Sequence, residues 1–578
     1  MARERDGGSV FVIVGIDLGT TNSLVATWQD GEPRLIPNAH GGFLTPSAVS
    51  IDDNGEVLVG AAALERVTSH PERSTAAFKR YMGTERRLIL AGREFRPEEL
   101  SALVLRALKA DGEVFLGAPL RRAIITVPAY FNDTQRKATR IAGELAGFEV
   151  LRLVNEPTAA ALAYGLHGEM RESKFLVFDL GGGTFDVSVL ELFEGIIEVR
   201  AVAGDNFLGG EDFVDLIAAW FERAAKLDLP TREADPTPHA QLRRQANAAM
   251  RRLSTAEEVV VEIAWKGRPA TARLTRGAFE KMAEPLLDRL RRPVERALHD
   301  ARLRPAELSH VVLAGGATRM PMVRRLAGRL LGRPAMQQIN PDEVVARGAA
   351  VQVGLHQRDK ALQEIVLTDV APYTLGIEIL RALRHGQYAG GQFLPIIERN
   401  TIIPASRMQT VHTVADNQTA LHFNIYQGES RLVADNIKLG EIIIEVPPGP
   451  AGKETAEVRF TYDVNGLLEV EVISLGTGER RKTVIEKNPG GMTQAEIDEH
   501  LAALSDLKIA PRERSENRAL LARAERLHEE VLGEARQAVA QAILAFETVL
   551  QMQRPEPIDE QRRRLSQLLD RIDRELRY

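Results

Sequence analysis

The sequence reads V-G-I-D-L-G-T-T-N-S at residues 14–23, and a second version, V-F-D-L-G-G-G-T-F-D, follows at residues 177–186. Each version starts in an apolar run, turns at Asp-Leu-Gly and enters a second apolar run. Such runs predict buried strands, so each version predicts a strand–turn–strand hairpin. Two such hairpins predict a duplicated α/β domain with a nucleotide held between its halves.

The first turn offers the groups that a phosphate needs. Gly19 allows a phosphate to approach the backbone closely, and Thr20 and Thr21 supply N–H and hydroxyl donors. Asp17 can accept a hydrogen bond from a water bound to Mg²⁺. An ordinary polar hairpin turn explains the same residues, because Asp-x-Gly turns are common.

The second turn contains three consecutive glycines, Gly181, Gly182 and Gly183, between Asp179 and Asp186. Consecutive glycines remove packing from a strand turn and add entropy to the unfolded chain, so a close approach of the backbone to another group explains them better than a purely structural turn. Further glycine turns follow at residues 204–205, 209–212 and 314–317.

Composition limits the classes of protein that this chain can form. Its 578 residues predict three or four domains, and a net charge of -6 argues against nucleic acid as a partner. The absence of cysteine excludes disulfides and thiolate chemistry and fits a reducing compartment. No run of about 18 apolar residues occurs, so we expect no transmembrane helix and no membrane partner.

Helical and strand patterns fill the region between the two turns. We expect helices at 97–111 and 132–146, the second with Asp133 as its N-cap, and a strand at 122–127. An alanine-rich helix follows at 157–164.

Two charged residues in this region have an ordinary structural interpretation. Lys79 follows a phenylalanine, and a lysine in such a place is usually a solvated surface group. Glu156 stands beside Pro157, where a carboxylate stabilises a helix N-terminus. The competing interpretation of Glu156 is a carboxylate that faces the phosphate site.

The pattern changes in the last third of the chain. Residues 364–370 have the pattern of one more apolar strand, and short alternating strands such as 422–427 and 467–473 then predict a β-sandwich. Taken alone, the sandwich suggests a structural or carbohydrate-binding module. The end of the chain is helical in pattern, with a capping box at 492–496 and a charged face that fits a solvated helical bundle.

Together, six motifs resemble those of the DnaK-type 70-kDa heat-shock chaperones. They are G-I-D-L-G-T-T-N-S at 15–23, V-P-A-Y-F at 127–131, N-E-P-T-A-A at 155–160, residues 179–186, G-G-E-D at 209–212 and N-P-D-E at 340–343. A short second lobe, and Pro372 and Tyr373 after residues 364–370, look closest to the HscC branch of that family.

The resemblance implies a multidomain architecture. It implies an actin-like duplicated α/β ATPase domain at 1–360, an interdomain linker at 361–370, a β-sandwich peptide-binding domain at 371–488 and a helical lid at 489–578. The chain ends at Tyr578 without an acidic tail, so no tail-binding co-chaperone site is expected.

The resemblance also implies roles for individual residues. Asp17, Glu156 and Asp179 would hold a hydrated Mg²⁺ through waters, and Lys79 and Asp186 would orient the attacking water or a monovalent ion, expected to be K⁺. The implied catalytic residues are Lys79, Glu156, Asp179, Thr184 and Asp186. The implied ATP and ADP contacts are Gly19, Thr20, Thr21, Gly181, Gly182, Gly183, Gly209, Gly210, Arg251, Ser254, Gly315, Gly316, Arg319 and Asp342.

The adenine end departs from the family pattern. The glutamate and lysine usual beside the base fall on Asn247 and Met250, and the segment at 259–275 looks abbreviated. We therefore expect weaker nucleotide retention and little need for an exchange factor. Thr368 stands where the linker usually has leucine, and a hydroxyl entering an apolar groove should weaken docking by on the order of 1 kcal/mol.

The sandwich departs as well. By resemblance the peptide contacts are Leu380, Val411, Val414, Leu421 and Phe423. Leu421 replaces the usual valine of the pocket, and Val414 is larger than the usual alanine of the arch over the peptide. A tighter pocket predicts a preference for smaller apolar side chains.

The implied function is that of a cytoplasmic, stress-related, ATP-dependent chaperone whose ATP hydrolysis controls capture and release of unfolded peptides. A J-domain co-chaperone would act near Arg152, Asn155 and Asp369, and Pro128 and Arg136 would relay the nucleotide state. Two other classes stay open. A sugar-kinase-like transferase would share the phosphate loops without the sandwich, and an actin-like filament protein would polymerise with ATP.

Overall fold

The computed structural model describes residues 4–6, 9–165, 172–193, 196–231, 234–265, 268–336, 339–359, 362, 366–382, 388–463, 468–485, 515–531, 533–552 and 555–575. The chain divides into two units. The first comprises Met1–Thr374, Glu398–Ile403 and Lys487–Gly491, and the second comprises Leu375–Ile397, Pro404–Glu486 and Met492–Tyr578.

The first unit is built on two large sheets with the same core topology. In each, three successive antiparallel strands form a meander and a later strand joins the first of them in parallel. The first sheet has the order β12 (Glu149–Asn155), β11 (Leu120–Val127), β2 (Ser9–Asp17), β3 (Asn22–Gln29), β4 (Glu32–Ile36), with β1 (Glu4–Asp6) and β5 (Thr45–Pro46) beside this path. The second has the order β18 (His310–Ala314), β13 (Ser173–Leu180), β14 (Phe185–Phe193), β15 (Ile196–Asp205), β19 (Val366–Val370), β22 (Ile402–Ile403). The predicted hairpins and the duplication are confirmed.

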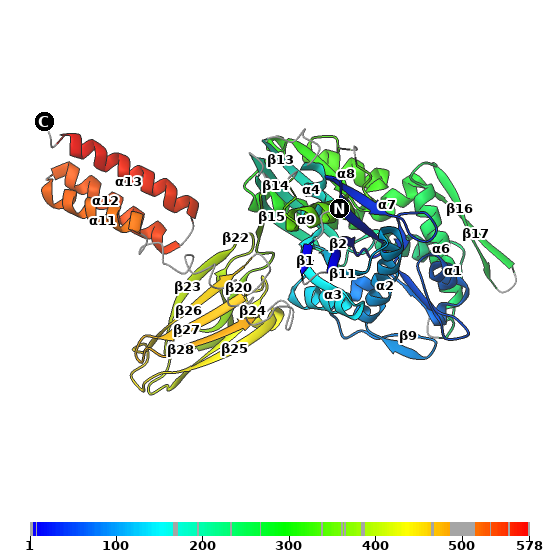
Figure 1. Ribbon diagram of the computed structural model, residues 1–578, viewed down its shortest axis with the longest axis horizontal. Helices are drawn as coiled ribbons and strands as arrows, with labels where there is room; N and C mark the ends of the chain where they lie inside the picture. Colours follow the sequence, from blue (N-terminus) through cyan, green and yellow to red (C-terminus); the bar gives the residue numbers. More distant parts are fainter. Residues whose placement is uncertain are drawn as a thin grey trace. The chain divides into compact units, whose positions relative to one another are not determined.

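Helices α4 (Glu156–Gly165) and α9 (Val344–His356) share one apolar core with both sheets. The two helices approach so closely that a Cβ on Gly348 would lie 1.7 Å from the carbonyl oxygen of Ala159. Figure 1 shows them between the strands of the first unit. We call the first sheet with its helices the first lobe, and the second sheet with its helices the second lobe.

The outer helices cover the other face of each sheet. In the first lobe these are α2 (Pro97–Leu116) and α3 (Asp133–Leu145). In the second lobe α5 (Gly210–Ala224), α6 (Thr237–Arg252), α7 (Arg276–Asp300) and α8 (Pro321–Leu331) share one core. The remaining elements are smaller: α1 (Ala61–Ser69), β6 (Ala48–Ile51), β7 (Val57–Val59), β8 (Ser74–Ala76), β9 (Leu88–Leu90), β10 (Arg93–Phe95), β16 (Glu258–Trp265), β17 (Arg268–Thr275), η1 (Pro71–Arg73), η2 (Phe78–Tyr81), η3 (Pro305–Glu307) and η4 (Gly316–Arg319).

Two helix boundaries differ from the prediction. The N-cap of α3 is Asn132 and not Asp133, because the Asn132 side chain accepts a hydrogen bond from the Gln135 N–H. Helix α2 continues past residue 111 and ends at Gly117, which has the left-handed φ of 62° that terminates many helices.

Among its described residues, the second unit contains two four-stranded sheets and three helices. One sheet has the order β21 (Tyr388–Ile397), β20 (Leu375–Ala382), β24 (Ala420–Gln427), β25 (Ile437–Glu445), and the other β23 (Ala405–His412), β26 (Thr455–Tyr462), β27 (Leu468–Ser474), β28 (Arg480–Ile485), with η7 (Val433–Asp435) between strands. The strands predicted at 422–427 and 467–473 correspond to β24 and β27.

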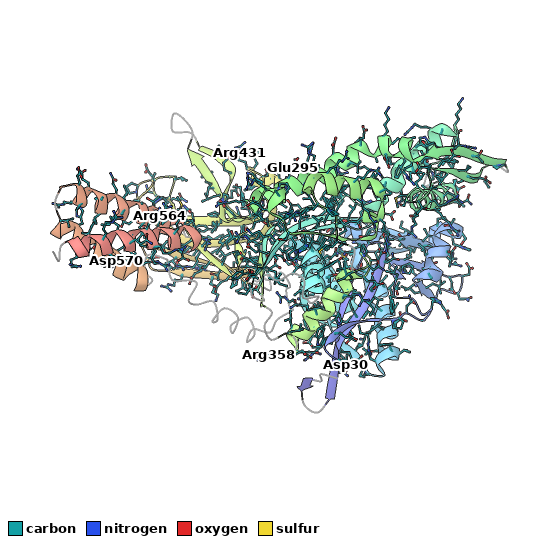
Figure 2. The ribbon with its side chains drawn as sticks, turned by 90° about the horizontal axis from the view of Figure 1, so that it is seen from above. Asp30, Glu295, Arg358, Arg431, Arg564 and Asp570 are labelled. Atoms are coloured by element: carbon teal, nitrogen blue, oxygen red, sulfur yellow. The ribbon has the colours of Figure 1, made fainter. Side chains whose placement is uncertain are left out.

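The helices α11 (Ser515–Glu530), α12 (Gly533–Met552) and α13 (Pro555–Glu575) pack around Leu527, Phe546 and Leu569. Charged side chains such as Arg564 and Asp570 lie on α13 (Figure 2), and Asp570 pairs with Arg523 at 2.8 Å. The capping box predicted at 492–496 lies outside the described residues.

Candidate active site

The two glycine turns of the first unit press against each other. A Cβ on Gly182 would lie 2.0 Å from Thr21 Oγ1, and one on Gly183 would lie 2.8 Å from Thr20 Oγ1. The glycines are therefore required by the contact between the turns. This is a tertiary cause that the sequence does not reveal, and it brings both predicted phosphate loops to one place.

The second turn is also fixed from behind. The carbonyls of Gly181 and Gly182 accept hydrogen bonds of 2.9 Å from the N–H groups of Gly210 and Glu211. In a trans peptide the N–H points opposite to the carbonyl, so the N–H groups of Gly182 and Gly183 point away from α5. Backbone N–H groups held in this way form a concave site for an anion.

Four carboxylates lie around the turns. Asp17 ends β2 and accepts a hydrogen bond of 3.2 Å from Thr126, Asp179 and Asp186 face each other across the β13–β14 ladder, and Glu156 begins α4. Burial, followed by repulsion from Glu156, raises the pKa of Asp17 and of Asp186 to about 7. The same two causes raise the pKa of Asp179 well above its usual value.

One lysine offsets this negative charge. Lys79 is only 3 % exposed and its Nζ donates to Glu156 Oε1 at 2.8 Å. It also lies over the Phe131 ring, 5.5 Å from the centroid. The interpretation of Lys79 as a solvated surface group is therefore wrong, and the position of Glu156 within an ion pair favours the phosphate-facing interpretation over a helix-end role.

The acidic cluster fits a hydrated dication. Asp179 Oδ2 is buried and makes no hydrogen bond within the described part of the chain, and an unpaired buried carboxylate oxygen is costly. Among those residues no group of three His, Cys, Asp or Glu side chains is arranged to hold a metal directly. Because Mg²⁺ usually keeps several waters, carboxylates set back from the ion suit it.

The predicted adenosine contacts fall into two places. The Gly315 N–H donates to the Pro341 carbonyl at 3.0 Å, and Arg319 binds Asp342 at 2.7 Å, so these residues meet beside β18. A Cβ on Gly316 would lie 2.7 Å from Asp342 Oδ1. Arg251 lies near the C-terminal end of α6, as do the half-buried Asn247 and Met250, and Ser254 follows in the turn after that helix.

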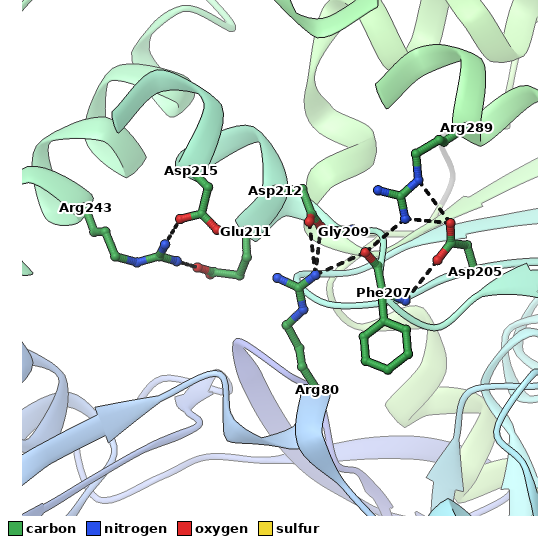
Figure 3. Close-up of polar contacts among 9 residues, drawn as sticks. All are labelled: Arg80, Asp205, Phe207, Gly209, Glu211, Asp212, Asp215, Arg243 and Arg289. Carbon is green, nitrogen blue, oxygen red and sulfur yellow. Dashed lines mark hydrogen bonds and ion pairs between the residues drawn. The ribbon is translucent and has the colours of Figure 1, made fainter. Parts of the chain in front are cut away.

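Two arginines lie around the N-terminus of α5, and one of them, Arg80, connects the lobes, a feature the sequence did not reveal (Figure 3). Arg80, from η2 of the first lobe, binds Asp212 of the second lobe at 3.0 Å and the Phe207 carbonyl at 3.2 Å. Arg289 binds Asp205 at 2.7 Å within the second lobe. The one feature of the sequence that could have pointed to Arg80 is its position directly after Lys79.

The last five residues of the segment predicted as a linker, Val366–Val370, form strand β19 in the second sheet. Ile196–Glu198 of β15 pair in parallel with Val366–Thr368 of β19. Asp369 then accepts a hydrogen bond of 3.0 Å from Asn155, which accepts one of 2.6 Å from Arg136. Thr368 Oγ1 is buried and has no hydrogen-bond partner among the described residues.

The predicted peptide contacts lie on both sheets of the second unit. Leu421 and Phe423 are buried on β24, whereas Leu380 on β20 is 48 % exposed. Val411 lies on β23 in the other sheet, and Val414 follows in the β23–β24 connection, where its N–H donates to Gln418.

A duplicated fold with two opposed phosphate loops, buried carboxylates and one buried lysine defines a nucleotide phosphohydrolase class of site. A family model described as Hsp70 protein matches residues 13–90 and 86–576. Chaperone protein DnaK from Thermotoga petrophila, Thermotoga maritima and Thermotoga neapolitana is 44 % identical over 488 residues, covering 82 % of this chain and 80 % of each relative.

The chain belongs to the Hsp70 family, and it is an ATPase and an ATP-dependent chaperone. Membership implies the use of nucleotide and Mg²⁺, and substrate peptides and J-domain co-chaperones as partners. No helix in the described ranges is both long and apolar enough to cross a membrane.

Proposed function

We propose that ATP hydrolysis at the two glycine turns controls capture and release of apolar peptide segments by the β-sandwich. The observation that carries this proposal is the convergence of both turns, Lys79 and four carboxylates in the same unit as β19. We assign residues 1–360 to the actin-like ATPase domain, 361–370 to the linker, 371–488 to the peptide-binding domain and 489–578 to the lid.

In this proposal the chain's own groups position the reactants. The N–H groups of Gly182 and Gly183, with Thr20, Thr21 and Thr184, bind the phosphates, and Lys79 stabilises charge on the transferred group. Asp186, held by the Tyr130 N–H at 2.9 Å, orients the attacking water. Mg²⁺, held through waters by Asp17, Glu156 and Asp179, neutralises the phosphate charge when it is bound, and K⁺ is the proposed monovalent ion.

The other nucleotide contacts follow the same assignment. Gly315, Gly316, Arg319 and Asp342 hold one side of the adenosine, and Arg251 and Ser254 hold the other. Asn247 and Met250, in place of the charged residues usual in the family, favour fast nucleotide release. An exchange factor is then dispensable.

Peptide binding is assigned to Leu380, Val411, Val414, Leu421 and Phe423. The buried Leu421 and Phe423 favour an apolar pocket floor, and the exposed Leu380 favours a contact above it. A J-domain partner is assigned to the surface around Arg152, Asn155 and Asp369, in the cytoplasm.

Steady-state ATP hydrolysis with and without an unfolded apolar peptide tests the proposal. We expect the peptide to raise the rate severalfold in the full chain and to have no effect in Lys79→Ala. Hydrolysis that requires a sugar, or ATP-dependent polymer that sediments, would contradict it.

A further inference from the structure

Tyr373 lies three residues after the end of β19 and contacts the backbone that holds Asp186. Its hydroxyl donates to the Tyr130 carbonyl at 2.6 Å, and the two rings lie 4.7 Å apart between centroids. The two tyrosines are 243 residues apart in the sequence, so only the folded chain brings them together.

Tyr130 is fixed through both of its peptide groups. Its N–H donates to Asp186 Oδ1 at 2.9 Å, and the carbonyl of the same peptide plane, that of Ala129, accepts from Arg136 at 3.1 Å. In the next plane the Phe131 N–H donates to Pro128 at 3.1 Å, and the Tyr130 carbonyl accepts from Tyr373. Tyr373 therefore holds the peptide group that directly follows the one whose N–H binds Asp186, and so helps to fix the direction of that N–H.

A second donor binds the same carbonyl and provides an internal comparison. Asn206 Nδ2 donates to the Tyr130 carbonyl at 2.7 Å. Asn206 follows β15 within the second lobe, so its contact does not require β19. Of these two donors, only Tyr373 makes its hydrogen bond dependent on the segment after β19.

That segment is held in place by backbone pairing. The Ala371 N–H donates to the Thr401 carbonyl at 2.9 Å and the Asn400 N–H donates to the Ala371 carbonyl at 2.7 Å. The Thr374 hydroxyl accepts from the Arg399 N–H at 3.1 Å. Tyr373 is therefore held beside Tyr130 by backbone pairing that continues from β19.

We propose that Tyr373 is a positioning residue for ATP hydrolysis, which aligns Asp186 through the Tyr130 backbone when β19 is paired with β15. This inference rests on the proposed role of Asp186. It predicts that the chemical step is faster with β19 in place, and that one tyrosine hydroxyl carries part of this acceleration.

Single-turnover hydrolysis by the full chain, with protein in excess over ATP, tests the proposal. Tyr373→Phe removes the hydroxyl and keeps the ring, and we expect a three- to tenfold slower rate with ATP affinity unchanged within twofold. Tyr373→Leu also removes the ring contact and should be slower still. Tyr426→Phe on β24 of the second unit is the matched control and should keep the native rate.

The same substitution in a second background separates positioning from general stability. Leu367→Pro removes an N–H from β19 and disrupts its pairing with β15. There, Tyr373→Phe should change the rate by less than 1.5-fold. An unchanged rate in the native background, an equal loss in both backgrounds, or a loss of ATP affinity instead of rate would each overturn the role of Tyr373.

Asp186→Asn distinguishes the two levels of the proposal. If Asp186→Asn hydrolyses ATP at the native rate, the proposed role of Asp186 fails and the role of Tyr373 fails with it. If Asp186→Asn is inactive and Tyr373→Phe is fully active, only the inference about Tyr373 fails.

Discussion

The buried carboxylate of Asp186 lowers the free energy of unfolding of the nucleotide-free protein at neutral pH. Because its pKa is raised to about 7, the folded chain binds its proton more tightly than the unfolded chain does. The protonated Asp186 therefore contributes to the free energy of unfolding at low pH, and this contribution is lost as the pH rises from about 4 to about 7.

We expect Asp186→Asn to stabilise the nucleotide-free protein, because asparagine keeps an acceptor for the Tyr130 N–H without the buried charge. The gain should be near zero at pH 4 and on the order of a few kcal/mol at pH 8. Calorimetric unfolding without Mg²⁺ at both pH values measures it. Asp205→Asn, which removes a partner of Arg289, is the control and should lose stability. A variant no more stable than the native chain at pH 8 would refute the electrostatic account.

Leu421 is the residue at which peptide preference is expected to differ from the usual pattern. Leu421 is 7 % exposed on β24. In the proposed peptide pocket, its extra methylene group relative to valine would take up space that a ligand side chain could otherwise occupy. Leu421→Val should shift preference on a peptide array toward larger apolar residues by a few-fold. Leu475→Val, at a 54 % exposed position outside the assigned cleft, is the control. Identical preferences for native and Leu421→Val would count against this account.

Local patterns were sufficient to predict the strands, both turns and three of the four acidic residues, because a turn displays its glycines and aspartates in sequence. Lys79 had no local signal of burial. The contacts of Tyr373 and Arg80 join distant segments, which periodicity does not encode. The buried hydroxyl of Thr368, in contrast, agrees with the hydroxyl that the sequence predicted in an apolar groove. The predicted N-cap of α3 was wrong by one residue, because Asn132 and Asp133 are both good capping residues.

At the scale of elements, the contact between η2 and α5 is expected to control the opening of the lobes. Arg80 and Asp212 are 14 % and 21 % exposed, so their ion pair is better shielded than a surface pair. Arg80→Gln should speed ADP release about five- to tenfold, equivalent to about 1 kcal/mol. Release of a fluorescent ADP analogue by stopped flow measures it.

The matched control for Arg80 is Arg289→Gln. Arg289 pairs with Asp205 inside the second lobe and so does not join the lobes. Equal acceleration in both variants would show that the loss of any arginine near α5 loosens the site, and would reject a specific role for the pair between η2 and α5.

Strand β19 contains a buried hydroxyl group that a single substitution can remove. Thr368 Oγ1 is buried without a partner, and valine has the same shape without the hydroxyl. Thr368→Val should strengthen the pairing of β19 with β15 by about 1 kcal/mol and slow hydrogen exchange of its amides about fivefold. Thr374→Val removes an acceptor that the Arg399 N–H uses and should have the opposite effect. Faster exchange in Thr368→Val would disprove the assignment.

At the scale of the whole molecule, ATP hydrolysis controls peptide binding. The duration of each ATPase cycle therefore depends on how long the nucleotide stays bound. In the proposed nucleotide site, turns, carboxylates and Lys79 converge at the phosphate end. The proposed adenine end includes Asn247 and Met250 of α6, neither of which can form an ion pair. Retention should therefore be limited by the adenine end.

We expect the native chain to release ADP quickly without an exchange factor, and Asn247→Glu combined with Met250→Lys to slow release about tenfold, the effect of about 1.4 kcal/mol. Asn247→Gln, which adds length without charge, is the control. Stopped-flow release with and without an exchange factor measures both. Slow release from the native chain that a factor accelerates strongly would reject the prediction. Fast release from both native and double variant would place the determinant elsewhere, with the pair between Arg80 and Asp212 as the next contact to test.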